Sequence, residues 1–355
     1  MKRMKKWLVF GLVTAIVACA VGCSADSQSS SGGAQKEVVV YMPDGAPAMG
    51  VASLMAGDLE TDGVTYKVVS PTLIASKVSA KDQAANADIC ALPVTAASKL
   101  LGSGEKYRML GTLTGGNLYI LSKDSQTVAD FSASGVSDLS HLVGKTVGVM
   151  KINEVPGLTF KCILENYGLA WQELKNDGAV ADDKVNLKAI VDATAINPLA
   201  TDIACYVVAE PAASVQVKKN GFVNVASLSG LYDKGEVVEG YSGYPQAVLV
   251  AKTSLIEERT AWVAQFMDDV AASGAALSSM SGADIVAAVT AHLEDSSYTT
   301  TLKANVLSAE TVARCGVHFV ESASCKKAVV SYLSRLTEVD SAAAKTVSDA
   351  FFYLG

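Results

Sequence analysis

Residues 37–57 read Glu-Val-Val-Val-Tyr-Met-Pro-Asp-Gly-Ala-Pro-Ala-Met-Gly-Val-Ala-Ser-Leu-Met-Ala-Gly, and this stretch decides the fold. Residues 38–40 form the apolar run typical of a parallel strand buried on both faces, and Pro43, which has no N–H to donate, is expected to stop it. Asp44 and Pro47 then predict a capped helix start. Unpaired N–H groups at such a turn could hold a small molecule, although an ordinary strand–helix unit without a ligand fits equally well.

The first 22 residues have the pattern of an export signal. Four basic residues lie within the first six, and an apolar run at 7–21 follows, too short and wrongly flanked to remain as a spanning helix. Residues 20–23, Ala-Val-Gly-Cys, resemble the lipobox of bacterial lipoproteins, which implies diacylation of Cys23 and cleavage before it. A plain secretory signal with an incidental cysteine is the alternative. Residues 23–35, rich in serine, are then a flexible tether.

The charge balance bears on the class of partner. The chain has 29 Lys+Arg and 36 Asp+Glu, and removing the four basic residues before Cys23 leaves 25 against 36, a net charge of −11. An acidic chain without a basic cluster argues against nucleic acid and against acidic lipid surfaces as partners. A hydrophobic content of 50% with 18% charged residues suits α/β cores with helices on both sides of the sheets.

Cysteine and histidine point to no cofactor. An odd number of cysteines remains after Cys23, so they cannot all be paired, and a bridge between Cys315 and Cys325 stays open. There is no CxxC pair, and the three histidines lie far from any cysteine or acidic cluster, so a zinc site has no ligand set.

The strand–turn–helix pattern recurs along the chain. Consecutive units of this kind predict mainly parallel sheets with their loops at one edge. Strands are expected at 66–69, 88–91, 107–113, 118–122, 185–190 and 201–208, and helices at 73–85, 93–101, 158–167, 255–277, 282–293, 328–336 and 342–352.

Five motifs, found in this order, carry a resemblance to a known family. Together they resemble the substrate-binding lipoproteins of ABC importers in the nitrate/sulfonate/taurine and thiamine-precursor group. The motifs are Met42-Pro43-Asp44-Gly45-Ala46-Pro47, Ala87-Asp88-Ile89-Cys90-Ala91-Leu92-Pro93, Leu142-Val143-Gly144-Lys145-Thr146-Val147-Gly148, Ala209-Glu210-Pro211-Ala212-Ala213 and Gly243-Tyr244-Pro245-Gln246-Ala247. The Gly-Lys-Thr step is not a phosphate loop, because it lacks the upstream glycine and enters a strand.

The resemblance implies a two-lobed α/β fold of the periplasmic-binding-protein type II class, with mainly parallel sheets and two crossing strands as a hinge. The ligand would close between the lobes by hinge motion. We expect lobe one at residues 36–117 plus 246–355 and lobe two at 118–245. The protein would be a monomer, lipid-anchored outside the cytoplasm, that delivers a small solute to ABC permease subunits.

The expected ligand site gathers at the turns that face the gap between the lobes. The N-terminal ends of helices favour anions. The acidic residues at these turns would repel an anion, and no arginine, which could bind an anion through two hydrogen bonds, is expected near a cleft turn. A neutral or cationic nitrogen heterocycle is therefore favoured, with sulfonate or another small anion as the alternative; caps, loops and hinge packing are the competing roles for these residues. The expected ligand-binding residues are Asp44, Gly45, Ala46, Pro93, Val94, Thr95, Asn117, Asn153, Glu154, Val155, Glu210, Tyr241 and Tyr244.

Two other functions compete with import. A lipid-anchored sensor that passes ligand occupancy to a membrane receptor would have the same sequence features. An enzyme of the same fold in thiamine or menaquinone precursor synthesis is disfavoured, because Cys90 and Cys205 sit inside predicted strands and no histidine falls on a cleft turn. No catalytic residue is therefore expected.

Overall fold

The structure is a computed structural model and describes residues 37–57, 63–134, 138–175, 178–235 and 238–355. The predicted signal peptide, Cys23 and the tether lie outside the described residues. Within the described part, no helix is both long and apolar enough to span a membrane.

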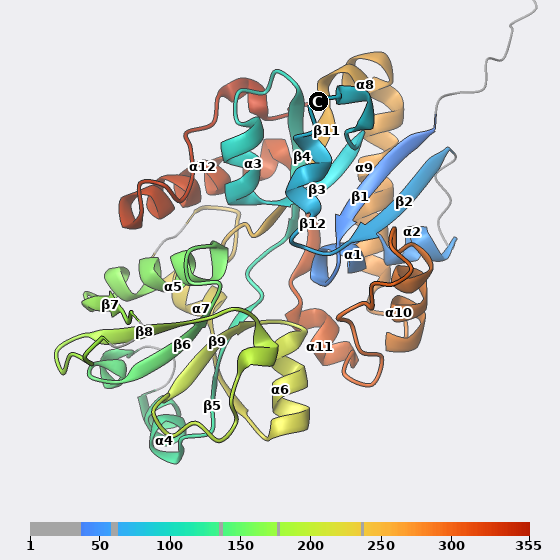
Figure 1. The fold of residues 1–355 in the computed structure, drawn as a ribbon. Coiled ribbons are helices and arrows are strands. Elements are labelled where there is room, and N and C mark those ends of the chain that lie inside the picture. Colours follow the sequence, from blue (N-terminus) through green and yellow to red (C-terminus); the bar gives the residue numbers. More distant parts are fainter. Residues whose placement is uncertain (1–36, 58–62, 135–137, 176–177, 236–237) are drawn as a thin grey trace, which may run out of the picture. The chain divides into compact units, whose positions relative to one another are not determined.

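Two six-stranded sheets form the framework (Figure 1). The first has the order β12-β4-β11-β3-β1-β2 and the second the order β10-β5-β9-β6-β8-β7. The strands of the first are β1 (Val38–Pro43), β2 (Val64–Val69), β3 (Ile89–Pro93), β4 (Tyr107–Thr114), β11 (Ala247–Lys252) and β12 (Val317–Glu321). Those of the second are β5 (Leu118–Ser122), β6 (Thr146–Met150), β7 (Trp171–Glu173), β8 (Val185–Ile190), β9 (Cys205–Ala209) and β10 (Val223–Ser227).

Helices cover both faces of each sheet. We call the first sheet with α1–α3 and α8–α12 lobe one, and the second sheet with α4–α7 lobe two. Lobe one contains α1 (Ala46–Met49), α2 (Ala52–Ala56), α3 (Val94–Leu101), α8 (Thr253–Glu258), α9 (Thr260–Ala276), α10 (Gly282–Ala291), α11 (Ala309–Arg314) and α12 (Ser322–Val339). Lobe two contains α4 (Ser125–Ser134), α5 (Val155–Asn166), α6 (Ala212–Asn220) and α7 (Leu228–Gly235). Short 3-10 turns are η1 (Ile74–Val78), η2 (Gln83–Ala85), η4 (Ser140–Leu142), η5 (Ala193–Ala195) and η6 (Asp349–Phe351).

The predicted two-lobed α/β fold is confirmed, with sheets that are mixed rather than mainly parallel. β1 pairs with β2 and β3 in parallel, and β6, β7, β8 and β9 likewise form parallel pairs. β11 enters antiparallel between β3 and β4, and β5 lies antiparallel to both β9 and β10. The cause is the pair of lobe crossings. Residues 115–117 lead from β4 straight into β5, and the return segment before β11 brings that strand back in the opposite direction.

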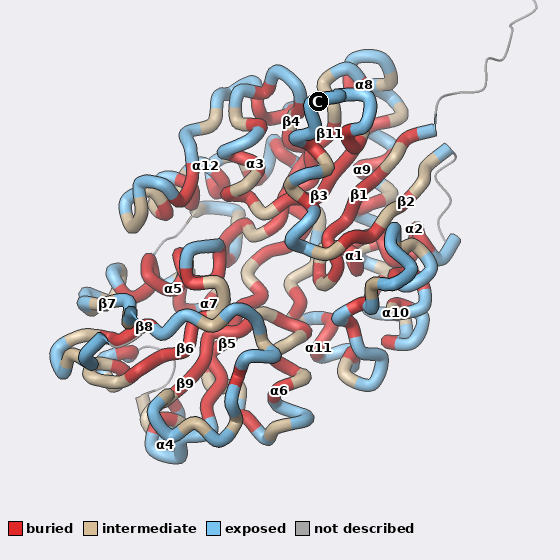
Figure 2. Tube along the Cα trace, in the orientation of Figure 1, coloured by how far each residue is buried: buried red, intermediate tan, exposed pale blue. Residues whose placement is uncertain are grey.

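Apolar burial follows the strands and the helices that face them (Figure 2). One apolar cluster lies within lobe one between the sheet and α1, α2, α9 and α10, and a second lies within lobe two beneath α6. A third cluster includes residues of both lobes, among them Tyr332 and Leu336 of α12 and Phe160 and Leu164 of α5.

Two elements near the N-terminal end of the described chain differ from prediction. β1 includes Pro43, because the N–H of Asp44 donates to the carbonyl of Val69 at 2.8 Å and so continues the pairing that proline cannot. The helix predicted at 73–85 is wrong and is replaced by η1 and η2. There the Asp82 carboxylate accepts from the N–H two residues on, at 3.0 Å, and this local bond starts a new turn.

The helix predicted at 342–352 is also wrong. The segment contains only η6 and is otherwise irregular. Its backbone is held against lobe one instead: the N–H of Ser348 donates to Gly102 and that of Tyr353 to Met109, at 2.8 and 2.9 Å. Hydrogen bonds to neighbouring elements therefore replace those that a helix would form within itself.

Candidate functional site

Asp44 follows β1 but does not cap α1. Gly45, with φ 107°, is the residue before that helix, and no side chain bonds to its first turn. The Asp44 carboxylate instead accepts hydrogen bonds from Tyr298 Oη (3.0 Å), Thr300 Oγ1 (2.6 Å), and the N–H and Oγ1 of Thr301 (2.7 and 2.8 Å). It is 4% exposed, so its first role in this structure is to hold the loop that follows α10.

The pKa of Tyr298, which donates to Asp44, is also shifted by this buried carboxylate. Burial, followed by the charge of Asp44 and the hydrogen bond to it, raises the pKa of Tyr298 to about 12. Tyr298 is therefore a hydrogen-bond donor to Asp44 at neutral pH.

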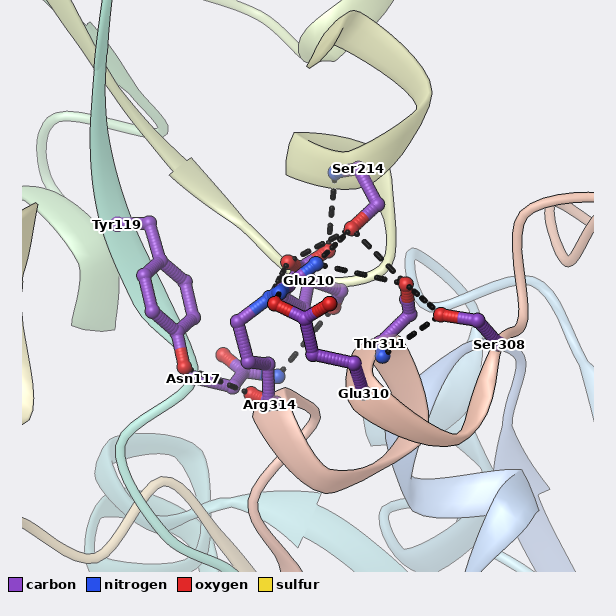
Figure 3. Close-up of polar contacts among 8 residues, drawn as sticks. All are labelled: Asn117, Tyr119, Glu210, Ser214, Ser308, Glu310, Thr311 and Arg314. Atoms are coloured by element: carbon purple, nitrogen blue, oxygen red, sulfur yellow. Dashed lines mark hydrogen bonds and ion pairs between the residues drawn. The ribbon is translucent and has the colours of Figure 1, made fainter. Parts of the chain in front are cut away.

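Glu210 stands at the end of β9, just before α6. Its carboxylate accepts from the N–H and Oγ of Ser214, in the first turn of α6, at 3.0 and 2.9 Å. It also accepts from Nε of Arg314 at 2.8 Å (Figure 3). The Glu210 side chain is 1% exposed and that of Arg314 is 27% exposed. The expectation that no arginine lies near a cleft turn is thus wrong: α11 of lobe one brings Arg314 to Glu210 from far along the chain.

Other polar contacts join α11 to lobe two at this place, and Figure 3 shows them together. Arg314 Nη2 donates to Ser214 Oγ at 2.8 Å, and Thr311 Oγ1 donates to the same oxygen at 3.3 Å. Tyr119 Oη donates to the carbonyl of Arg314 at 3.3 Å. Burial, followed by the charge of Glu210, raises the pKa of Tyr119 to about 12. We call this set the α11–α6 contact.

Asn117 lies at the first crossing between the lobes. Its backbone N–H donates to Gln246 Oε1 of the return crossing at 3.3 Å, and its Nδ2 donates to the carbonyl of Glu210 at 3.4 Å. Because that carbonyl can only accept, the amide orientation is fixed. Oδ1 then has no hydrogen-bond partner within the described part of the chain, although Asn117 is only 3% exposed. A buried acceptor left open in this way needs a donor.

The other predicted residues of lobe one lie where β3 passes into α3. Pro93 ends β3, and Val94 and Thr95 begin α3, both buried. The N–H of Val94 donates to the carbonyl of Gln246 at 3.0 Å. This turn is therefore tied to the same crossing residue as Asn117. Ala46, the first residue of α1, is buried as well.

On lobe two, the predicted turn before α5 is more open. Asn153 and Glu154 are exposed, whereas Val155, the first residue of α5, is buried. Glu154 precedes the helix without capping it and pairs with Lys151 at 3.2 Å.

The two predicted tyrosines lie in different surroundings. Tyr244 is fully buried, with its ring stacked on Tyr332 at 5.7 Å and an interplanar angle of 23°. Tyr241 donates to Thr112 Oγ1 at 3.4 Å and borders a pocket of about 370 Å³ beside the crossings. The pocket is lined by Gly115, Gly116, Ser229, Gly240, Tyr241, Ser242, Gly316, His318 and Val320.

The five cysteines that the structure describes are all free and buried. Cys315 and Cys325 are among them, so the bridge left open by the sequence is absent. Burial raises the pKa of Cys205 to about 12 and that of Cys325 to about 11. Among the described residues, no three His, Cys, Asp or Glu side chains gather where they could hold a metal ion.

Reasoning along the sequence missed Arg314, Ser214, Thr300 and Thr301. The run of hydroxyl side chains at 298–301 was the available signal, because such a run supplies several donors at once. Nothing in the sequence pairs that run with Asp44.

Comparisons with known proteins concern the fold. No protein-family model matches the sequence, and no curated protein matches it significantly. Among solved structures, one of an ABC transporter from Parabacteroides distasonis has 19% identity and a TM-score of 0.66, covering 90% of this chain and 99% of that one. The alkanesulfonate-binding protein SsuA from Xanthomonas axonopodis pv. citri, bound to MOPS, has 15% identity and a TM-score of 0.53, covering 88% and 95%. The aliphatic sulphonate binding protein SsuA from Escherichia coli has 10% identity and a TM-score of 0.56, covering 90% and 92%. At such low sequence identities, these similarities show the fold alone. The chain has the two-lobed fold of ABC-transporter substrate-binding proteins.

Proposed function

We propose that the protein captures a small solute between its lobes and delivers it to an ABC import permease. The observation that carries the proposal is the open acceptor of Asn117. This buried residue touches both crossings and the carbonyl of Glu210, and its buried Oδ1 has no hydrogen-bond partner within the described part of the chain. A solute that donates a hydrogen bond to Oδ1 would be held where the lobes meet. The fold shared with sulfonate-binding proteins supports the same reading.

We propose that the solute is neutral and carries an N–H or O–H group. The carboxylate of Asp44 already accepts four hydrogen bonds, Glu210 is paired with Arg314, and Glu154 with Lys151. The sequence argument for a cation rested on free carboxylates, and it loses that support. A sulfonate, which the two similar proteins named above bind, would need Arg314 to leave Glu210 unpaired and buried, at high cost. A neutral nitrogen heterocycle remains compatible with these contacts.

The test is mass spectrometry of small molecules released by heat from the purified full-length protein. We expect an unmodified compound that is neutral at pH 7 and bears a donor group. Asn117→Ala should carry much less of it, and Asn305→Ala, which changes an exposed asparagine of lobe one, should carry the wild-type amount. Equal loading of the two variants, at matched melting temperature, would reject Asn117 as a ligand contact. A chemically altered product would favour the enzyme alternative.

We further propose that Cys23 is lipidated and anchors the protein outside the cytoplasm. The lipobox-like residues 20–23 support this location. In membrane fractionation, Cys23→Ala should move the protein to the soluble fraction. Unchanged membrane partitioning would count against the anchor.

A further inference from the structure

The two lobes touch along two flanks of different chemistry. On one flank α12 packs on α5, and Tyr332 and Leu336 belong to the same buried apolar cluster as Phe160 and Leu164. The seam also has polar contacts: Thr159 Oγ1 lies 2.6 Å from Tyr332 Oη, both buried, and Arg335 of α12 contacts Asn166 Oδ1 at 2.9 Å and Glu165 Oε2 at 3.5 Å. We call this flank the α12–α5 seam.

On the other flank, the α11–α6 contact is polar. Val312 of α11 belongs to the apolar cluster of lobe one and Ala213 of α6 to that of lobe two, and neither of these clusters crosses between the lobes. Among the bonds that cross here are those from Arg314 and Thr311 to lobe two, the bond from Tyr119 Oη to the carbonyl of Arg314, and a hydrogen bond from Lys218 to the carbonyl of Asn305.

Polar and apolar contacts differ in the free energy that is lost when the two lobes separate. Polar groups that part can exchange their partners for water, so the net loss is small for groups near the surface. Apolar side chains that part must expose their surface to water, and that loss grows with the area exposed. The lobes should therefore separate at the polar flank first.

We infer that the lobes open by parting α11 from α6 while the α12–α5 seam stays closed, and that the Glu210–Arg314 ion pair is the latch of this opening. The inference rests on the proposed function, since it describes how a solute would gain access to the gap beside Asn117. Glu210 is the buried partner and Arg314 the partly exposed one. Closing the lobes thus buries a carboxylate, and the arginine compensates its charge only in the closed arrangement.

The test measures the two flanks separately by pulsed dipolar spectroscopy between pairs of nitroxide labels. One pair, Lys219→Cys with Ala309→Cys, spans α6 and α11. The other, Ala170→Cys with Ser334→Cys, spans the α5 side of lobe two and α12. All four positions are exposed, so the labels replace no buried side chain.

The full-length protein is used with Cys19 and Cys23 replaced by serine, so that the only native cysteines left are the five buried ones. Arg314→Met is compared with Arg335→Met. The latter is the matched control, because Arg335 also joins the lobes, through Asn166 Oδ1 at 2.9 Å and an ion pair with Glu165 at 3.5 Å, but lies at the seam. Melting temperatures confirm that each variant is folded. No solute is added, so the result does not depend on whether the protein binds one.

Arg314→Met should lengthen the α6–α11 distance and raise the ratio of open to closed molecules at least tenfold, because the substitution removes the partner of a buried carboxylate. The seam distance should not change in that variant, and Arg335→Met should change neither distance. An unchanged α6–α11 distance in Arg314→Met, or a longer seam distance, would overturn the inference. Failure of solute binding with these distances as expected would refute the proposed function and leave the latch in place.

Discussion

Replacing Asp44 with alanine should destabilise the protein substantially, because the carboxylate is a structural acceptor. The substitution removes four hydrogen bonds, and Thr300, which is 6% exposed, would then be left without its 2.6 Å acceptor. A hydrogen bond to a charged group contributes about 1.5–3 kcal/mol to stability. Because the exposed Thr301 can bind water instead, we expect the free energy of unfolding to fall by about 2–4 kcal/mol in total. For a chain of this size the melting temperature should fall by roughly 3–6 °C.

The assay is thermal and urea unfolding of the full-length protein, followed by circular dichroism. Asp295→Ala is the control, because this nearby carboxylate is exposed and, among the described residues, accepts from Ser297 in its own turn alone, at 2.8 and 2.7 Å. The control should change the melting temperature much less than Asp44→Ala. If Asp44→Ala unfolds like the wild type but loses solute binding, the carboxylate is a ligand contact and the structural reasoning is refuted.

Two further predictions concern stability. Partial burial raises the pKa of Glu294, but hydrogen bonds from Lys77 (2.5 Å) and Tyr41 (2.6 Å) outweigh it and lower the pKa below its usual 4.5. At pH 7 the free energy of unfolding of the wild type should therefore exceed that of Glu294→Gln by about 0.5–1 kcal/mol, measured by urea unfolding. This difference should vanish as the pH falls through the lowered pKa; a difference that persists in acid would contradict the prediction. Tyr332→Phe should lower the free energy of unfolding by about 1 kcal/mol. Thr159→Val should lower it more, because that substitution leaves the buried hydroxyl of Tyr332 without its partner; urea unfolding that gives the reverse order would disprove the role of this pair.

Much of the fold could be predicted from the sequence. The strands expected at 118–122 and 185–190 have the observed bounds, and the helix expected at 93–101 begins one residue later, because their apolar runs and flanking turn residues are local signals. The segment 73–85 could not be predicted, since a side-chain bond from Asp82 competes with the helix. The segment at 342–352 failed because its partners lie in lobe one, far away in sequence.

The candidate site was harder to predict, because its charges are paired by residues distant in the chain. Asp44 and Glu210 were predicted as ligand-binding residues at turns facing the gap, but the donors of Asp44 and the arginine paired with Glu210 come from the segment 298–314. A carboxylate that has no partner in its own sequence neighbourhood can therefore be mistaken for a free ligand group. Asn117, by contrast, lies where the crossing was expected, and whether it touches a solute remains a prediction.

The position of β11 has a consequence for how the molecule assembles during synthesis. The strands of the second sheet all lie between residues 118 and 227, so lobe two can form as soon as that stretch has left the ribosome. In the first sheet, β11 lies between β3 and β4, which are made more than 130 residues earlier. Until β11 is translated, β3 has one unpaired edge and β4 has two, because the other neighbour of β4, β12, is translated later still. The nascent chain thus carries exposed strand edges for as long as lobe two takes to emerge, and this is the interval in which binding by a chaperone would matter most.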